Sequence, residues 1–309
     1  MTTLFQTEAG KQSILGWYER FRAKLTVPTE SRTVTTGFGD THVLIGGPET
    51  GPPVLLLHGA LASSAHLLVE LAALLEQFRV YAVDIVGQSV KSAETRISVT
   101  NNDHGLWLRE VLDQLGLAQT HVVGVSWGGF VAIRLAVCAP ERIDRLALLV
   151  PAGVVGGPVW AGLTKMALPM LMYRLWPSQR RLQRFLRHLL TTHDDDWTPY
   201  LGDALRLYNL RMSVPALVQP AELARFTRPT LVVGAEHDVG IPGAKLITRA
   251  AALFPSLAGT ELIEGAYHSP PTTPVFRQWL SGRLTRFFLN DEHKPVAIRS
   301  GTPDLQAAV

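Results

Sequence analysis

The stretch VVGVSWGGF, from Val122 to Phe130, places one serine between glycines directly after a run of β-branched residues. The run is typical of a buried strand, and the residues from Trp127 onward have the apolar composition of a buried helix. Glycines two residues before and two residues after Ser126 would allow the backbone to turn sharply between these two elements. We therefore predict that Ser126 is a nucleophile exposed on this turn. The alternative is a glycine-rich connection in which the serine is incidental.

Short apolar runs alternate with helical patterns on both sides of this stretch. The predicted strands are PVLLLHG, RVYAVDIVG, HVVGV and IDRLALLV, and the helical segments between them are residues 63–77, 104–116 and 127–139. Strands that are apolar on both faces and are each followed by a helix indicate a parallel sheet covered on both sides. Earlier in the chain, residues 13–25 predict a helix, and RTVTTGFGDTHVLIGG predicts an antiparallel hairpin at one edge of the sheet.

The alternation stops after Pro151. Residues 152–226 are rich in Leu, Met, Trp and Arg and predict helices without a strand. Alternation resumes with the strand PTLVVG, a helix at 243–254, the strand GTELIEG and a last helix at about 273–289. Because the strands on either side look like parts of one sheet, we predict a main domain of residues 1–151 and 227–289. Residues 152–226 would form an inserted helical cap, and residues 290–309 a polar C-terminal tail.

Catalysis by a serine hydroxyl needs two further groups, because the hydroxyl is a weak nucleophile at neutral pH. An imidazole must accept its proton, and a carboxylate must orient and stabilise that imidazole. The segment LVVGAEHDVGIP supplies Glu236 and Asp238 just past a predicted strand, and LIEGAYHSP supplies His268 just past the next one. We therefore predict that His268 is the general base for Ser126 and that Asp238 or Glu236 is the acid.

Negative charge that develops on a substrate carbonyl oxygen needs hydrogen-bond donors around it. The backbone amide of Trp127, directly after the serine, is one predicted donor. The loop after PVLLLHG should supply the second, which we place at Ala60, with Leu61 as the neighbouring alternative. We interpret His58 as part of the His-Gly turn that shapes this loop; the alternative is an additional catalytic base.

Four segments occur in the order FGDTHVLIGGP, LLLHGALASS, YAVDIVGQSVKSAE and HVVGVSWGG. Together they resemble the α/β-hydrolase fold family and, within it, bacterial carboxylesterases of about this size. The resemblance covers nearly the whole chain apart from the tail. It implies an α/β-hydrolase fold with a mostly parallel central sheet and an inserted helical cap, and the chain order of serine, acid and histidine that is found here.

The resemblance also bears on single residues. It favours Asp238 over Glu236 as the acid, because the place of Asp238 before Pro242 matches the family's loop. It implies a structural role for Asp84, at the start of the segment DIVG. Serine at the nucleophile position, where epoxide hydrolases and haloalkane dehalogenases have aspartate, disfavours those branches. Tyr267 departs from the family, which often has glycine directly before the catalytic histidine.

The predicted cap should decide the substrate, because it would cover the strand ends where ligands bind. The residues that we expect to contact the substrate are apolar or aromatic, namely Leu61, Met170, Tyr173, Trp176 and Tyr267. The alternative is that the cap residues among them only pack the cap onto the main domain, and that Tyr267 only packs beside the histidine.

Two charged clusters also lie in the predicted cap. Arg180, Arg184 and Arg187 share one helical face, which we interpret as solvated; the alternative is attraction of an anionic substrate or surface. The segment HDDDW, with His193 followed by Asp194–Asp196, is interpreted as an acidic cluster in a loop or at a helix start rather than as a metal site.

Composition limits the partners of the chain. Its 309 residues are 47% hydrophobic, which is enough for a large core, and Lys+Arg exceed Asp+Glu by only 29 to 26. We therefore expect no nucleic-acid partner. The single cysteine, Cys138, leaves no intramolecular disulfide, and we find no signal peptide or membrane-spanning run. We expect a cytoplasmic protein of undetermined oligomeric state, without cofactor, metal or stable membrane insertion.

These observations predict a serine ester hydrolase that acts through an acyl-enzyme on small or medium carboxylic esters. The same three residues could instead serve a C–C bond hydrolase, a lactonase or an acyltransferase. Outside enzymes, the alternative is a catalytically silent module that binds a ligand in the same fold.

Overall fold

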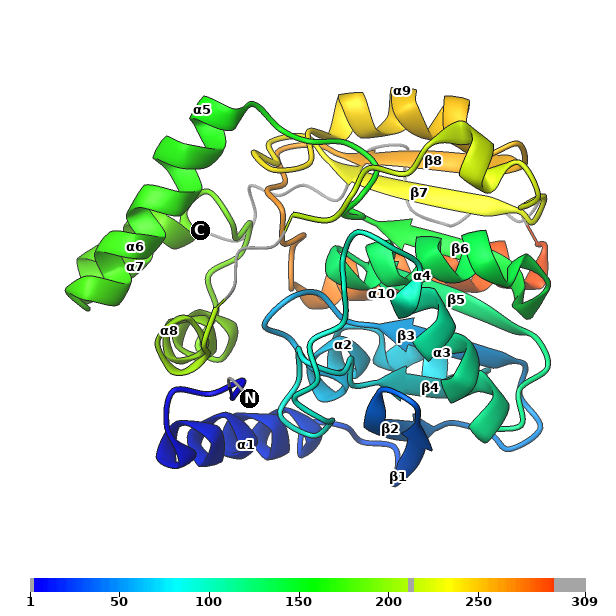
Figure 1. Cartoon of the computed structure of the whole chain (residues 1–309), viewed down its shortest axis with the longest axis horizontal. Helices are drawn as coiled ribbons and strands as arrows, with labels where there is room; N and C mark the ends of the chain where they lie inside the picture. Colours follow the sequence, from blue (N-terminus) through cyan, green and yellow to red (C-terminus); the bar gives the residue numbers. More distant parts are fainter. Residues whose placement is uncertain (1–2, 211–213, 292–309) are drawn as a thin grey trace.

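The computed structural model describes residues 3–210 and 214–291 of the chain. Eight strands form one sheet in the order β1-β2-β4-β3-β5-β6-β7-β8 (Figure 1). The strands are β1 Thr29–Thr36, β2 Gly39–Gly46, β3 Pro53–Leu57, β4 Arg79–Val83, β5 Thr120–Val125, β6 Ile143–Leu149, β7 Thr230–Ala235 and β8 Leu257–Ile263. β2 pairs antiparallel with β1 and with β4, and all other pairs are parallel. The predicted edge hairpin and the mostly parallel sheet are therefore confirmed.

Helices cover both faces of the sheet, and alternate side chains of each buried strand enter two separate cores. The helices that cover the sheet are α1 Glu8–Arg22, α2 Ser64–Glu70, α3 Asp103–Gln114, α4 Trp127–Cys138, α9 Gly243–Leu253 and α10 Pro274–Leu289. On β3, Val54 and Leu56 pack in the core that α1, α2 and α10 share, whereas Leu55 and Leu57 pack in the core of α3, α4 and α9. This alternation is why the strands are apolar on both faces.

Two helices differ from their predicted bounds. The first helix begins at Glu8 rather than at residue 13, because Thr7 caps it and its hydroxyl accepts a hydrogen bond from the amide of Gly10. The segment predicted as one helix at 63–77 is α2 followed by a 3₁₀ helix, η1 Ala72–Glu76, since the backbone of Leu71 lies outside the helical region.

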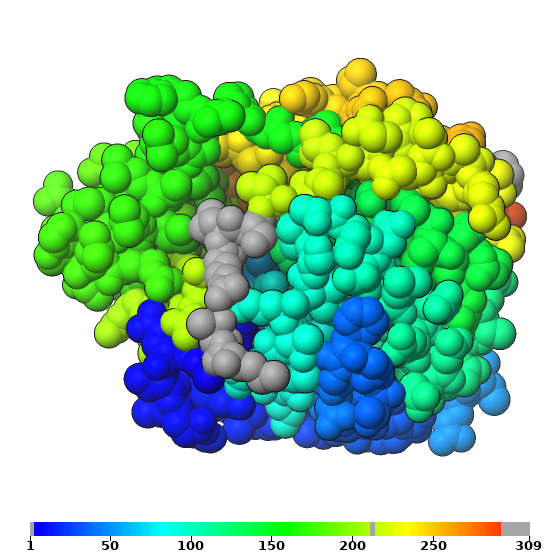
Figure 2. Space-filling model, viewed as in Figure 1, coloured from blue at the N-terminus to red at the C-terminus, as the bar shows by residue number. Residues whose placement is uncertain are grey.

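The insertion, residues 152–226, lies between β6 and β7 in the chain, and its described residues form helices. These are α5 Val159–Ala161, the π-helical turn η3 Gly162–Ala167, α6 Leu168–Leu175, α7 Gln179–Leu186, α8 Trp197–Leu207 and the 3₁₀ helix η4 Pro220–Leu223. α5, α6 and α7 project from the main body as a lobe, on the left in Figures 1 and 2. Residues 292–309 of the predicted tail lie outside the described residues.

No helix in the described parts of the chain combines the length and the apolar character that crossing a membrane would need.

Candidate active site

Ser126 stands on a strained turn at the carboxyl end of β5. Its backbone has φ 50° and ψ −109°, a conformation that residues other than glycine rarely adopt. A Cβ atom at Gly124 would lie 2.6 Å from the carbonyl oxygen of Gly128, and one at Gly128 would lie 2.1 Å from that of Leu57. The turn therefore requires both glycines. The Ser126 amide donates to the carbonyl of Leu149 on β6 at 2.9 Å, which ties the turn to the next strand.

The three predicted side chains meet at this edge of the sheet. Ser126 Oγ lies 2.8 Å from His268 Nε2, and His268 Nδ1 lies 2.6 Å from Asp238 Oδ2. Asp238 is buried, and its other oxygen accepts the amides of Gly240 and Ile241 at 2.8 and 2.9 Å. Because these donors fix the carboxylate, Asp238 can hold one ring orientation and one tautomer of His268.

Glu236, the alternative acid, has a different position. Its side chain is about half exposed, and its carboxylate accepts the amide of Gly265 at 2.8 Å in the turn that precedes the histidine. Of the two carboxylates that the sequence left open, Asp238 is the one in contact with His268.

The surroundings of His268 strengthen it as a base. Burial by itself would lower the pKa of the imidazole, but the negative charge of Asp238 and its hydrogen bond outweigh burial and raise the pKa above the ordinary 6.5. The imidazolium that forms when Ser126 loses its proton would face this carboxylate and be stabilised by it.

The loop between β3 and α2 is shaped by His58, which is fully buried. Its Nδ1 donates to the carbonyl of Gly59 at 2.8 Å, and its Nε2 accepts the amide of Ile85 at 3.0 Å. Burial lowers the pKa of His58, so that the ring is neutral at pH 7. Both ring nitrogens are occupied by the backbone, which fits the structural role rather than that of a second base.

The predicted oxyanion donors lie beside Ser126. Trp127 is the first residue of α4, where amides have no partner within the helix, and Ala60 and Leu61 line the cavity next to the serine. Leu61 has φ 62°, and its carbonyl accepts a hydrogen bond from the Tyr200 hydroxyl on α8. That bond fixes the direction of the peptide plane in the loop.

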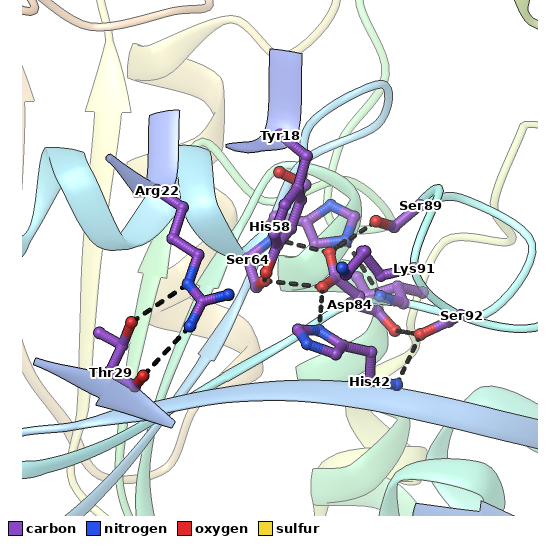
Figure 3. Close-up of polar contacts among 12 residues, drawn as sticks. Tyr18, Arg22, Thr29, His42, His58, Ser64, Asp84, Ser89, Lys91 and Ser92 are labelled. Atoms are coloured by element: carbon purple, nitrogen blue, oxygen red, sulfur yellow. Dashed lines mark hydrogen bonds and ion pairs between the residues drawn. The ribbon is translucent and has the colours of Figure 1, made fainter. Parts of the chain in front are cut away.

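Asp84 lies just past the end of β4, at the centre of the polar contacts drawn in Figure 3. The carboxylate is fully buried and accepts the amide of Ser64 at 2.8 Å, the hydroxyl of Ser64 at 2.7 Å and the hydroxyl of Ser89 at 2.5 Å. His42 Nδ1 on β2 lies 2.7 Å from it. Burial would raise the Asp84 pKa, but the His42 hydrogen bond and the other donors hold it below its ordinary value, so the group is ionised. It fixes the first residue of α2, and with it the end of the loop between β3 and α2.

A cavity of about 290 Å³ extends from Ser126 and His268 between α2, α10 and the insertion. Most of the side chains that line it are apolar. They include Leu67 and Leu71 from α2, Phe276 and Leu280 from α10, and Leu189, Leu190, Trp197 and Leu201 from the insertion. Glu70 and Arg277, joined by hydrogen bonds of 2.7 and 2.8 Å, add one ion pair to the lining.

Only one of the predicted substrate contacts, Leu61, lines this cavity. Tyr173 is buried and donates to the carbonyl of Gly202 on α8 at 3.2 Å, Met170 packs against the core, and Trp176 is 56% exposed. The structure therefore places these three away from the cavity, since α6 lies on the outer side of α8. Tyr267 packs beside His237, with ring centroids 5.7 Å apart, and is not part of the lining either.

The cavity residues that the sequence reasoning missed come from α2, α8 and α10. Their helical spacing marks an apolar face, but spacing alone does not separate a face that lines a cavity from one that packs in a core.

The acidic cluster of the insertion has the structural role expected for it. Asp194 accepts the amides of Asp196 at 3.1 Å and Trp197 at 2.5 Å, at the start of α8, and its other oxygen accepts the Thr272 hydroxyl at 2.9 Å. Asp196 pairs with Arg20 on α1 and with Lys24, which follows the end of α1. The cluster thus starts a helix and joins the insertion to the N-terminal helix.

Taken together, a mostly parallel sheet with a serine on a strained turn after β5, and its partners after β7 and β8, defines the α/β-hydrolase class of fold. A family model described as alpha/beta hydrolase fold matches residues 52–214, which is more than half of the chain. The protein belongs to this family.

Similar proteins include two from Bacillus subtilis (strain 168). The chain is 40% identical over 147 residues to carboxylesterase YbfK, across 47% of this chain and 50% of the relative. It is 39% identical over 139 residues to the uncharacterized carboxylesterase nap, across 44% of this chain and 46% of the relative. The chain thus aligns with about half the length of these relatives. The crystal structure of naproxen esterase from Bacillus subtilis superimposes with a TM-score of 0.78 at 26% identity, covering 92% of this chain and 99% of that one.

Replacement of Asp84 tests the support of the loop between β3 and α2. Asp84→Asn should lower the free energy of unfolding by about 2–3 kcal/mol, because an amide nitrogen would face buried donors that now have an acceptor. Asp40→Asn, at an exposed carboxylate, should change it by less than about 0.5 kcal/mol. Urea denaturation measures both. Equal, small losses in the two variants would show that the buried contacts of Asp84 contribute little.

The two carboxylates beside His268 can be separated by kinetics. Asp238→Asn should lower kcat for an ester by about 10³–10⁴-fold, whereas Glu236→Gln should change it by no more than about twofold. In the wild type, kcat/KM should fall as pH drops through a pKa above about 6.5, since protonated His268 cannot accept the serine proton. In Asp238→Asn this pKa should be lower, because the charge that raises it is lost. A large loss in Glu236→Gln with near-normal Asp238→Asn would reverse the assignment.

Proposed function

We propose that this protein is a serine carboxylesterase that hydrolyses small or medium esters through an acyl-enzyme. The observation that carries the proposal is the continuous hydrogen-bonded chain from Ser126 through His268 to the buried Asp238, with spacings of 2.8 and 2.6 Å. The similarity to carboxylesterases over about half of the chain supports the same activity.

The first half of the reaction forms the acyl-enzyme. Ser126 Oγ attacks the ester carbonyl carbon while His268 Nε2 takes the hydroxyl proton. The carbonyl oxygen becomes an oxyanion that the amides of Trp127 and Ala60 bind. When the tetrahedral intermediate collapses, His268 gives its proton to the leaving alkoxide, and the alcohol departs.

The second half returns the enzyme to its starting state. A water molecule gives a proton to His268 and attacks the acyl carbon, and the same two amides bind the second oxyanion. Collapse then breaks the bond to Ser126 Oγ, which recovers its proton from His268. The acyl group leaves as a carboxylic acid. No other group is needed to balance these steps.

The size and lining of the cavity support the substrate class. At about 290 Å³ it lies just below the usual range for ligand pockets, roughly 300–1,000 Å³, and apolar side chains dominate its lining. An acyl or aromatic group of small or medium size fits these walls. A C–C bond hydrolase, a lactonase or an acyltransferase would use the same three residues, and a silent binding module would use the cavity alone.

The first test compares p-nitrophenyl esters from acetate to long acyl chains, with Ser126→Ala beside the wild type. Activity should peak at one chain length, and the variant should lose at least about 10⁴-fold in kcat because no other hydroxyl replaces the nucleophile. Activity retained in Ser126→Ala would overturn the mechanism. A wild type that is labelled by a fluorophosphonate but hydrolyses no ester would point to the other triad reactions, and one that does neither would point to the binding module.

The wall that α10 gives to the cavity can be tested at Leu280. Leu280→Ala should shift the preferred acyl chain toward longer esters, because Leu280 lines the cavity and its truncation enlarges it. Leu284→Ala, one turn further on, removes an equally buried side chain that does not line the cavity. Both should lose about 2–4 kcal/mol of stability, so only the chain-length profile should distinguish them. The same profile in both variants would place the acyl group elsewhere.

A further inference from the structure

Exposed apolar side chains are concentrated on one part of the insertion. Of the twelve large hydrophobic side chains that are exposed among the described residues, seven lie between Val159 and Trp176. Val159 is 87% exposed and Trp160 74%, and the others are Leu163, Leu168, Leu171, Leu175 and Trp176. This segment, with α7, forms the lobe that projects from the main body in Figure 2. Exposed apolar surface of this extent marks an interaction site in a folded protein.

The arrangement on the helix is ordered. α5, η3 and α6 follow one another without a break from Val159 to Leu175, and Trp160, Leu168, Leu171 and Leu175 recur at helical spacing on the outer side. On the inner side Pro169 and Tyr173 are buried. The helix is therefore held by one face and leaves a second apolar face without a partner in the described structure.

The same part of the chain is strongly basic. Residues 145–193 contain no aspartate or glutamate, and the six basic residues between Val159 and His193 are Lys165, Arg174, Arg180, Arg181, Arg184 and Arg187. Arg180, Arg184 and Arg187 line a groove between α7 and the start of α8, together with Gln183, His193 and Thr198. The rest of the chain then has 23 basic and 26 acidic residues. The small surplus of the whole chain thus conceals a basic lobe on an otherwise slightly acidic molecule.

We propose that this lobe, the outer side of α5, η3, α6 and α7, binds reversibly to the surface of an anionic lipid bilayer. Trp160 and the leucines would enter the region between headgroups and acyl chains, and the arginines of α7 would contact lipid phosphates. Charge favours lipid over a second copy of the chain. A two-fold dimer through this face would bring the basic lobe against itself, and like charges would oppose it.

Binding would bring the cavity close to the bilayer. Leu189 and Leu190, which line the cavity, come within about one turn of the end of α7 at Leu186, so the lobe and the candidate active site are joined by a short segment of chain. If the proposed esterase activity holds, esters that partition into the bilayer would be within reach. The binding itself does not depend on that activity.

Co-sedimentation of the full chain with vesicles tests the proposal. The protein should bind vesicles of phosphatidylglycerol and phosphatidylcholine, bind pure phosphatidylcholine vesicles weakly, and dissociate as salt is raised. Arg180→Glu with Arg184→Glu should weaken binding by at least about 25-fold, because each surface charge contributes about fivefold. Trp160→Ser with Leu171→Ser should also lose binding, through the apolar contact.

Matched variants outside the lobe serve as controls. Arg225→Glu changes an exposed arginine outside the lobe, and Leu289→Ser changes a leucine that is 47% exposed at the end of α10. Both should bind vesicles as the wild type does. All lobe variants should hydrolyse a short soluble ester normally, and Ser126→Ala should bind normally, so failure of the binding proposal and failure of the esterase proposal are distinguishable.

Three outcomes would overturn the lipid proposal. One is the absence of binding to anionic vesicles at low salt, and another is equal loss in the lobe and control variants. The third is a dimer in sedimentation that Trp160→Ser with Leu171→Ser dissociates, which would assign the apolar face to a second copy of the chain.

Discussion

The strained turn at Ser126 is the constraint on which the rest of the molecule depends. A positive φ at a serine is unfavourable. It persists because the surrounding structure holds the backbone of Ser126 in this conformation. Gly124 and Gly128 allow β3, β5 and α4 to approach so closely that a single Cβ would collide with a carbonyl. The hydroxyl is thereby lifted above the sheet edge, where the loops after β7 and β8 bring Asp238 and His268.

Two polar systems of different kinds support this edge. The Asp238 carboxylate acts on His268 directly, by charge and by one short hydrogen bond. The Asp84 carboxylate has no contact with the reacting groups and instead holds the first residue of α2, while the neutral ring of His58 holds the loop before it. One buried carboxylate thus holds the backbone of a loop, and the other raises the pKa of a histidine beside Ser126.

The insertion has two sides with separate roles. Its inner side, through Leu190, Trp197 and Leu201, supplies one wall of the cavity, and the Tyr200 hydroxyl bonds the carbonyl of Leu61 in the loop between β3 and α2. Its outer side carries the exposed apolar residues and the arginines. Tyr173 and Asp194 attach the insertion by hydrogen bonds to its own helices and to the main domain, so its orientation over the strand ends is defined.

The sequence by itself determined the sheet, the edge hairpin, the serine turn and the histidine, because each follows from local patterns: alternating apolar runs, glycine spacing and the position of polar residues after strands. It named Asp238 as the acid only through a family resemblance, since Glu236 lies equally near a strand end. Tertiary structure alone decided that Asp238 reaches His268 and that Met170, Tyr173 and Trp176 lie away from the cavity. The physical reason is that helical periodicity reports an apolar face without its direction, and the direction depends on which helix packs against it. The first helix was predicted to start too late for a related reason, because Thr7 caps it by a hydrogen bond that lies before the apolar repeat.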